Sequence, residues 1–310
     1  MAPAPLPRVA TLLPAATEIV CALGLEEALV GVSHECDWPP SVAAQAVLTS
    51  TRVGRGLPSA GIDRDVRSIL RDALAVYDVD VDALARAAPD VIVTQDLCDV
   101  CAVSLEDVRA AVRVLANPGA RIVNLHPTRL ADIWNDIRKV GAALGREREA
   151  EELLAGLLAR VERVRERAAR IPARPAVLTI EWLDPVMIGG TWMPEMVEIA
   201  GGRPLVTKPG DHAPTLSREE LAGLEPDVVL IKPCGFPLER TLAEIDRVRE
   251  VLAAVPGART WIADGNAFFN RPGPRIVDSL EILAGCVHPE AFADLAARHA
   301  LAVRKSLSSR

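Results

Sequence analysis

Aromatic residues are scarce in this sequence, which has five Trp, four Phe and one Tyr among its 310 residues. Long apolar runs are missing as well, because no apolar stretch reaches the roughly 20 residues that a membrane-spanning helix needs. We therefore expect no membrane insertion. Because the rings are so few, the places where they gather indicate where a ligand surface lies.

Familiar catalytic motifs are also absent. The sequence contains no Walker loop, no G-x-G-x-x-G, no G-x-S-x-G and no H-E-x-x-H. The formal net charge of −7 argues against binding to nucleic acid or to an anionic membrane surface. A protein that binds a small molecule is expected here, rather than an enzyme.

An export signal is not apparent at the start of the sequence. The first residues, MAPAPLPR, lack the basic start and apolar core of a signal peptide. The apolar segment that follows is interrupted by Pro14, Thr17 and Glu18. We therefore expect a cytoplasmic protein. In that compartment the six cysteines are expected to be thiols, metal ligands or redox groups, and not a disulfide framework.

The longest helical pattern runs from Arg146 to Arg170, near the middle of the chain. It contains no Pro, and apolar residues recur at helical spacing at Leu153, Leu154, Leu157, Leu158, Val161 and Val164. A helix of this length spans roughly 35 Å. It predicts a stiff connection between two lobes, although an ordinary amphipathic surface helix shows the same pattern.

Short apolar strands alternate with helical segments on both sides of that helix. The expected strands are 9–13, 28–32, 91–94, 121–125, 176–180, 228–231 and 260–263. This order predicts an α/β fold with two Rossmann-like lobes and mainly parallel sheets. We expect an N-terminal lobe at 1–126, linking helices at 127–172 and a C-terminal lobe at 173–310. Thr17 is expected to cap a helix, 51–64 to form a surface loop, and Ser217 with Glu220 to form a capping box.

Unusual polar and aromatic residues follow the predicted strands. Open α/β sheets bind ligands at the carboxyl ends of their strands, so these residues are expected to line one cleft. The candidate ligand-binding residues are Pro14, Thr17, Glu18, His34, Glu35, Cys36, Asp37, Trp38, Glu181, Trp182, Trp192, Phe236, Phe269, Asn270, Arg271 and Arg275. Aromatic faces with a few polar groups suit a large, flat, partly apolar ligand. The alternative is that the rings only cover the bases of loops.

Four cysteines fall in the same predicted loops, at Cys36, Cys98, Cys101 and Cys234. Thiolates of this kind suit zinc or an iron–sulfur cluster, and Cys98 with Cys101 also suits a redox dithiol. Small buried residues would look the same in sequence.

Arg271 and Arg275 lie on a Pro-rich loop that starts at Asn270. Two cations on a stiff loop could hold a carboxylate, an amide or a phosphate. They could equally tie the loop to the sheet.

Several of these segments together resemble a known family. RVATLLPAATEIVCALGLEEALVGVSHECDWPP at 8–40 is similar to the opening of the class III, helical-backbone substrate-binding proteins of ABC importers. VIVTQDLCDVCAVS, IEWLDP, TWMPE, IKPCGF and DGNAFFNRPGPR resemble a subgroup of cobalamin-binding or ABC-transporter substrate-binding proteins. The resemblance runs from about Arg8 to Pro289 and so covers nearly the whole chain.

The resemblance implies two lobes joined by one long helix, with little hinge motion. It implies cobalamin or a related corrinoid as the ligand, held between the lobes by Ser33–Pro40 and by the loops after Glu181 and Cys234. Together with the missing signal, it implies intracellular storage, delivery or sensing, with a corrinoid-dependent enzyme as partner. The alternatives are a metal-binding or iron–sulfur protein or enzyme that uses the cysteines, and an importer component that docks on an ABC permease.

Overall fold

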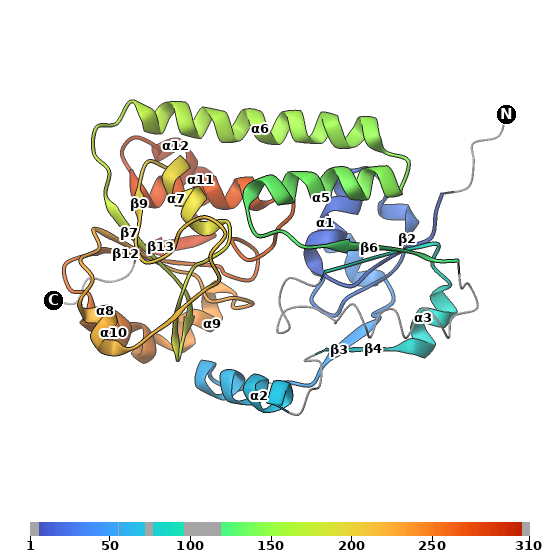
Figure 1. The fold of residues 1–310 in the computed structure, drawn as a ribbon, viewed down its shortest axis with the longest axis horizontal. Coiled ribbons are helices and arrows are strands. Elements are labelled where there is room, and N and C mark those ends of the chain that lie inside the picture. The colour runs from blue at the N-terminus through green and yellow to red at the C-terminus, as the bar shows by residue number, and fades with distance from the viewer. Residues whose placement is uncertain (1–5, 55, 72–76, 96–118, 306–310) are drawn as a thin grey trace. The chain divides into compact units, whose positions relative to one another are not determined.

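The computed structural model describes residues 6–54, 56–71, 77–95 and 119–305. The chain divides into two compact units (Figure 1). Unit 1 comprises 1–56, 64–127 and 131–155, and unit 2 comprises 57–63, 128–130 and 156–310. Each unit is described by itself below. No helix within the described residues is long and apolar enough to cross a lipid bilayer.

Unit 1 is built on a parallel sheet of strand order β2-β1-β5-β6. These strands are β1 (Val9–Thr11), β2 (Leu29–Val32), β5 (Val91–Gln95) and β6 (Arg121–Leu125). Leu12, Leu48, Leu84 and Ile92 pack together in its core. A separate antiparallel pair joins β3 (Thr49–Thr51) to β4 (Tyr77–Val79). The helices that lie wholly or partly in this unit are α1 (Pro14–Ala22), η1 (Glu26–Ala28), η2 (Pro40–Ala44), α2 (Ser59–Arg71), α3 (Val81–Ala87) and α5 (Leu130–Ala143).

Unit 2 contains a mixed sheet of order β10-β8-β7-β11-β12-β13, with β9 paired to β7. Its centre, β7-β11-β12, is parallel, and its margins at β8, β10 and β13 are antiparallel. The strands are β7 (Ala176–Leu183), β8 (Val186–Ile188), β9 (Arg203–Pro204), β10 (Thr215–Leu216), β11 (Val228–Ile231), β12 (Arg259–Ala263) and β13 (Val303–Lys305). The helices are α7 (Met193–Ile199), α8 (Arg218–Ala222), α9 (Leu238–Ala243), α10 (Ile245–Ala254), α11 (Ile276–Val287) and α12 (Ala293–Arg298).

Both faces of the central strands of unit 2 are buried. On one face Ile180 and Ile231 pack against Leu221, Val248 and other apolar residues of α8, α9 and α10. On the other face Val177, Val228 and Leu230 are equally buried, and α11 packs against β11. This two-sided burial explains why parallel strands such as VVLI are apolar throughout. The predicted α/β class with mainly parallel sheets is confirmed.

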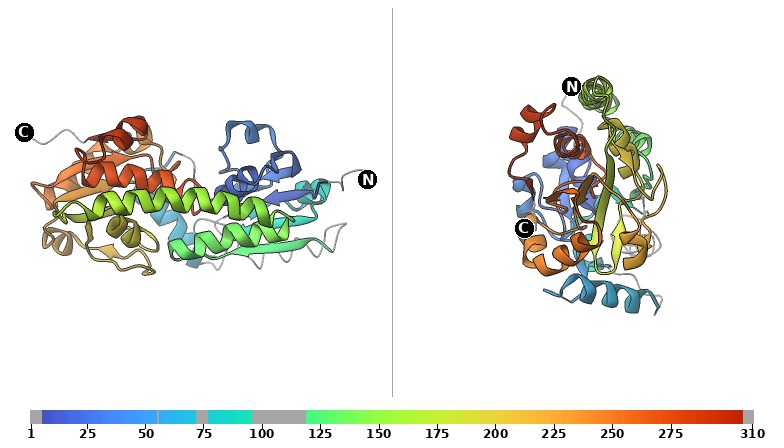
Figure 2. Two further views of the ribbon diagram at one scale, coloured as in Figure 1. Left: turned by 90° about the horizontal axis from the view of Figure 1, so that it is seen from above. Right: turned by 90° about the vertical axis from the view of Figure 1, so that its left-hand side faces the viewer.

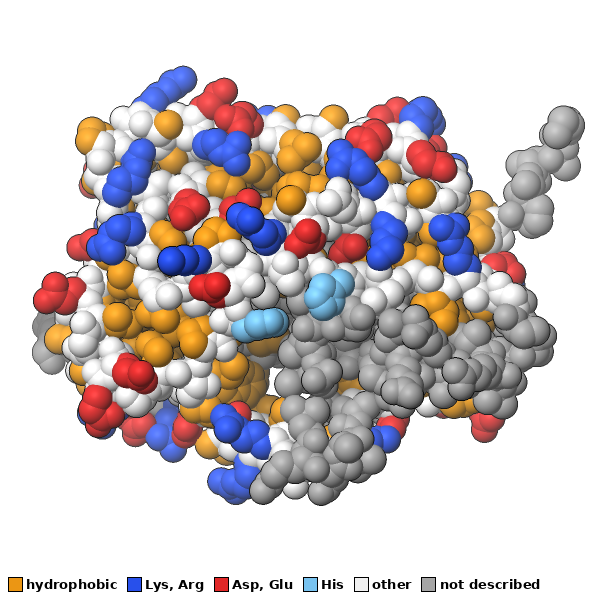
Figure 3. Space-filling view, viewed as in Figure 1, with side chains coloured by type: hydrophobic (Ala, Val, Ile, Leu, Met, Phe, Trp, Pro, Cys, Tyr) orange, Lys and Arg blue, Asp and Glu red, His pale blue; other side chains and the backbone are white. Residues whose placement is uncertain are grey.

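The predicted long helix is confirmed as α6 (Glu147–Ala169), which is one uninterrupted helix in Figure 1 and in the left view of Figure 2. It contributes 147–155 to unit 1 and 156–169 to unit 2. Its buried stripe consists of Ala150, Leu154, Leu157, Val161, Val164 and Ala168. Its solvent face carries ion pairs at helical spacing, such as Arg148–Glu152 and Glu162–Arg165. Side chains of both signs are visible along it in Figure 3. The helix is therefore amphipathic, with the apolar stripe holding it on the protein.

Two local predictions were wrong. Thr17 does not cap α1, because the helix begins at Pro14, where the fixed φ of proline and its missing N–H suit the first turn. The expected loop at 51–64 ends early, since α2 begins at Ser59. The capping box of Ser217 and Glu220 is confirmed at the start of α8.

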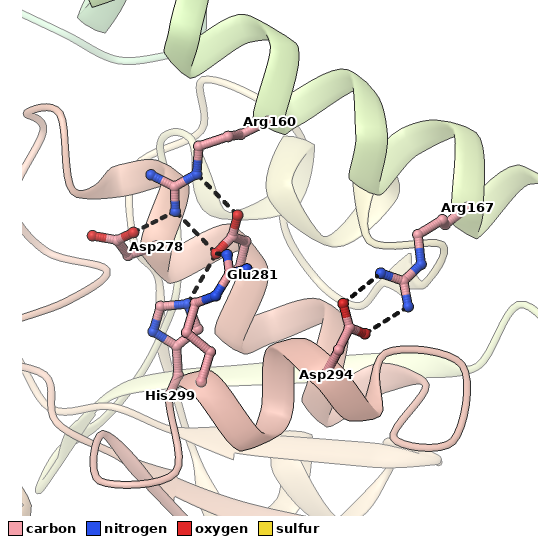
Figure 4. Close-up of polar contacts among 7 residues, drawn as sticks. Arg160, Arg167, Asp278, Glu281, Asp294 and His299 are labelled. Atoms are coloured by element: carbon pink, nitrogen blue, oxygen red, sulfur yellow. Dashed lines mark hydrogen bonds and ion pairs between the residues drawn. The ribbon is translucent and has the colours of Figure 1, made fainter.

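A charged cluster ties α6 to α11 within unit 2 (Figure 4). Arg160 pairs with Asp278, and its Nε donates to Glu281 Oε1 at 2.9 Å. The other oxygen of Glu281 lies 3.2 Å from Arg298 Nη1 and 2.9 Å from His299 Nε2. Asp278, Glu281 and His299 come close enough to share a cation, but the two guanidinium groups already neutralise the carboxylates. The cluster is a structural tie.

The Glu281 carboxyl is buried, with 4% of its side chain exposed. Burial alone would raise its pKa, but the hydrogen bonds from His299 and Arg160 and the charges of Arg160 and Arg298 outweigh it and lower the pKa to about 2. A lowered pKa means that the charged form stabilises the fold at neutral pH. This contribution is lost as the pH falls from the ordinary carboxyl range toward 2.

We predict that Glu281→Gln lowers the free energy of unfolding by roughly 3 kcal/mol at pH 7, because it leaves Arg160 without its main buried partner. Urea unfolding followed by circular dichroism measures this. The difference from wild type should shrink as the pH falls from about 4.5 toward 2, because the carboxyl of the unfolded chain takes up a proton before that of the folded protein does. The control is Glu151→Gln, which removes an exposed ion pair with Arg138 and should leave stability unchanged. Equal effects of the two substitutions would contradict the importance given to burial.

Candidate functional site

In unit 1 the candidate residues follow the carboxyl end of β2. Thr49 Oγ1 donates to Ser33 Oγ at 3.0 Å and contacts His34 Nδ1 at 2.7 Å. The His34 ring stacks edge-on against Tyr77, the single tyrosine of the chain, with centroids 4.9 Å apart. On its other side, His34 Nε2 lies 3.3 Å from Glu35. The imidazole is therefore fixed in orientation from three directions.

The residues on α1 are turned into the protein. Thr17 is fully buried, and its hydroxyl contacts Thr11 Oγ1 at 2.7 Å and Cys36 Sγ at 3.0 Å. Glu18 is 4% exposed, whereas Pro14 is half-buried. Thr17 and Cys36 thus tie α1 to the loop after β2.

The surface of that loop is formed by Asp37 and Trp38, which are both exposed, and by the half-buried Glu35. Trp38 is 46% exposed, although large apolar rings are usually covered. An exposed indole beside two acidic groups is the part of unit 1 best suited to contact a flat, partly apolar ligand.

In unit 2 the candidate residues converge on a lysine that the sequence analysis did not select. The Lys232 side chain is fully buried at the end of β11, yet it carries a charge. Its Nζ donates to Glu181 Oε2 at 3.0 Å and to Asn270 Oδ1 at 2.9 Å. Asn270 in turn donates from Nδ2 to the backbone oxygen of Gly265 at 2.7 Å. One ammonium group therefore joins the end of β7 to the residue after β11 and to the loop that follows β12.

An aromatic pair joins the end of β7 to the loop after β11. Trp182 and Phe236 meet edge to face with centroids 5.1 Å apart. Arg240 lies over the Phe236 ring at 5.0 Å and also donates to the backbone oxygen of Leu57. Phe236 is buried, while Trp182 is half-buried and presents part of its ring to solvent. The pair forms a supported apolar surface at the carboxyl end of β7.

Strand β7 changes register at Glu181, where its pairing to β8 passes from Ile180 to Trp182. Such a bulge alters the direction of the side chains next to it. Glu181 and Trp182 are consecutive and both half-buried, which breaks the alternation expected in a regular strand. The irregularity brings a carboxylate and an indole to the same end of the strand.

The loop after β12 is held in place mostly through hydrogen bonds of its backbone groups to side chains. Phe269 has a positive φ of 68°, its N–H donates to Ser279 Oγ, and its backbone oxygen accepts from Trp192 Nε1 at 2.8 Å. Both rings are buried, so Phe269 and Trp192 position the loop within unit 2. Arg271 is buried and donates to Asn266 Oδ1, and Arg275 lies over the Phe268 ring. Both arginines therefore have structural contacts.

The predicted cysteine site stays a prediction. Cys98 and Cys101 lie outside the described residues, while Cys36 and Cys234 form no disulfide within the described part of the chain and belong to different units. Burial together with the charges of Glu26 and Glu18 raises the pKa of Cys21 to about 12, and burial raises the pKa of Cys286. These last two thiols are protonated at neutral pH, which makes them poor metal ligands.

Lys232 and Arg240 are the residues of this region that sequence reasoning missed. The available signal was a lysine directly after the wholly apolar strand VVLI. A charge at that position is expensive to bury and must be paired.

The close packing of the loops makes Gly265 a sensitive position. A Cβ added there would lie 2.0 Å from the backbone oxygen of Pro233. We predict that Gly265→Ala lowers the free energy of unfolding by about 3 kcal/mol or more, because backbone must move to admit the methyl group. Gly156→Ala on α6 is the control. Its Cβ would meet nothing within 4 Å, and alanine in a helix stabilises by about 1 kcal/mol. Thermal unfolding compares the two, and similar melting temperatures would contradict this packing.

Comparison with known proteins places the chain in a family. The model of the family described as periplasmic binding protein matches residues 9–260. A curated relative from Bacillus subtilis, an uncharacterized ABC transporter substrate-binding lipoprotein YvrC, is 20% identical over 295 residues, which covers 92% of this chain and 81% of the relative.

Solved structures share the fold at low identity. The periplasmic heme-binding protein RhuT from Roseiflexus sp. is 23% identical, with a TM-score of 0.65 over 94% of this chain and 100% of that one. A periplasmic heme-binding protein from Pseudomonas aeruginosa is 20% identical, with a TM-score of 0.70 over 92% and 94% of the two chains. The periplasmic vitamin B12 binding protein BtuF of Vibrio cholerae is 19% identical, with a TM-score of 0.64 over 94% and 98%.

These matches confirm the predicted class III fold of two α/β lobes joined by one long helix. They also agree with the expectation of a binding protein, since members of the family bind substrates and do not transform them. The chain belongs to the periplasmic binding protein family and is a substrate-binding protein rather than an enzyme.

Proposed function

We propose that this protein binds a tetrapyrrole-type macrocycle, and specifically cobalamin or a related corrinoid. The observation that carries the proposal is the surface made by Trp182, Phe236 and Glu181 at the carboxyl end of β7. The indole of Trp182 and the carboxylate of Glu181 are on adjacent residues, in a protein that has only ten aromatic residues.

The shape of the ligand follows from this chemistry. A macrocycle of this class is large and flat, with an apolar face and polar groups around its edge. An indole held by a second ring offers a rigid apolar contact at a low cost in entropy, and a neighbouring carboxylate offers an acceptor to the edge. Related folds support the class, because similar solved proteins are named for binding heme and vitamin B12.

In unit 1 we assign a ligand contact to Trp38, with Glu35 and Asp37 as acceptors for polar side groups. His34, whose ring is fixed by Thr49 and Tyr77, is the nitrogen donor of unit 1 that we propose for a central metal. Cys36, Cys98, Cys101 and Cys234 are the alternative ligands, either for that metal or for zinc or an iron–sulfur cluster.

We propose two roles for the protein, which differ in partner and compartment. One proposed role is in the cytoplasm, where the protein would store, deliver or sense the corrinoid for a corrinoid-dependent enzyme. The family match and the substrate-binding lipoprotein of Bacillus subtilis favour docking on an ABC permease. Cell fractionation of the tagged native gene product distinguishes the two roles.

The ligand is tested by calorimetric titration of reduced, anaerobically purified protein with hydroxocobalamin, and with hemin in parallel. We expect one-to-one binding of hydroxocobalamin with a dissociation constant of about 1 μM or lower, equivalent to at least ~8 kcal/mol of binding free energy. Absence of heat and of any absorbance change with both compounds would refute the proposed ligand class.

The site is tested by Trp182→Ala, which removes the exposed ring and should weaken binding at least about tenfold, or ~1.4 kcal/mol. Trp182→Phe keeps a ring and should recover part of the affinity. Trp134→Ala, a half-buried tryptophan of α5 outside both candidate clusters, should bind as wild type. Circular dichroism checks that each variant is folded. Wild-type affinity in folded Trp182→Ala would contradict the assignment of the site.

A further inference from the structure

The Glu181 carboxylate is held from one side only. Lys232 Nζ donates to Oε2 at 3.0 Å, and across the described ranges this is the single side-chain partner that the carboxylate has. A carboxylate has about four acceptor positions. The Glu181 side chain is 23% exposed, whereas the Lys232 side chain is completely buried. The lysine is thus out of reach of a ligand, and the glutamate is not.

The buried lysine fixes the direction of the Glu181 carboxylate. Lys232 cannot turn to solvent, because it is enclosed and its Nζ also donates to Asn270 Oδ1 at 2.9 Å. The loop backbone adds a further constraint, since Cys234 N–H donates to the backbone oxygen of Glu181 at 3.0 Å. Oε1 is therefore a pre-oriented acceptor on the residue that precedes Trp182 in β7.

Two arginines that contact residues of this part of unit 2 already have anionic partners. Arg240, over the Phe236 ring, lies 3.7 Å from Glu244, whose carboxylate also accepts hydrogen bonds from Ser59. Arg247 lies 3.2 Å from Asp184, two residues after Trp182. A ligand carboxylate arriving at Trp182 would therefore meet the Glu181 anion and arginines that are already paired.

From these contacts we propose that Glu181 determines the class of ligand side group. Its free oxygen accepts a hydrogen bond from a primary amide N–H of the ligand and repels a carboxylate at the same position. On this basis, which rests on the proposed function, the protein selects an amide-bearing corrinoid over a macrocycle whose edge carries carboxylates. Lys232 acts as the positioning residue that holds Glu181 in this role.

The physical basis is an asymmetry between the two side groups. An amide N–H forms a charge-assisted hydrogen bond with a carboxylate, which is stronger than a bond between neutral groups. A carboxylate offers no donor and carries a like charge, which costs most where water is partly excluded. A glutamine at 181 would remove the repulsion and would also supply an N–H donor to a carboxylate.

The test compares two probes with the same ring, dicyanocobinamide with amide side chains and dicyanocobyrinic acid with carboxylates. For the wild-type full chain we expect the amide form to bind at least about tenfold more tightly. Glu181→Gln should lower this preference about tenfold, mainly through tighter binding of the carboxylate form. Glu219→Gln, an exposed glutamate of α8 in the same unit, removes the same charge and should leave the preference unchanged.

A second measurement does not depend on any variant. Higher salt screens the repulsion between like charges, so raising the ionic strength should strengthen wild-type binding of the carboxylate probe and leave the amide probe nearly unaffected. Equal affinities of wild type for the two probes, or the same preference in folded Glu181→Gln, would overturn the role of Glu181 while leaving the ligand class intact. Failure of wild type to bind either probe would overturn the proposed function itself, and the inference with it.

Discussion

The interaction on which the candidate site depends is the enclosure of one ammonium group between two acceptors. An unpaired charge is too costly to bury, so the fully buried Lys232 requires both Glu181 and Asn270. Glu181 lies near the carboxyl end of β7, Asn270 lies in the loop after β12, and the lysine directly follows β11. Satisfying one charge thus joins these three segments of unit 2. The tight approach of Gly265 to Pro233 and the buried ring of Phe269 complete the arrangement.

This arrangement explains how a rigid scaffold yields a selective surface. The parallel strands are buried on both faces and cannot carry polar groups along their length, so functional side chains collect where the strands end. The bulge at Glu181 then places an acid and an indole together. Elsewhere in unit 2, Glu281 and Arg160 form another buried ion pair, but it joins helix to helix and leaves no oxygen directed to a ligand. Both clusters pair a buried charged group with a group of opposite charge. We assign the Lys232–Glu181 pair to ligand selection and the Arg160–Glu281 pair to structure.

Periodic features of the sequence predicted most of the fold. The apolar stripe of α6 and the apolar runs at 91–95 and 228–231 identified helix and strands, because each pattern reflects burial of one known geometry. The start of α1 was mispredicted, since Pro14 at the first turn outweighed the capping preference of Thr17. At the site, residue type indicated Trp182 and Glu181 correctly as neighbours of a strand end. The role of Lys232 was not predictable, because its pairing joins residues 38 and 51 positions away.

The central claim is that Glu181, oriented by Lys232, receives an amide of a corrinoid that rests on Trp182. A crystal structure of the full chain grown with cobinamide tests it most directly. The account predicts the macrocycle in contact with the Trp182 ring, and an amide nitrogen of its edge at hydrogen-bond distance, about 2.9 Å, from Glu181 Oε1. A bound cobinamide that contacts neither Trp182 nor Glu181 would contradict it.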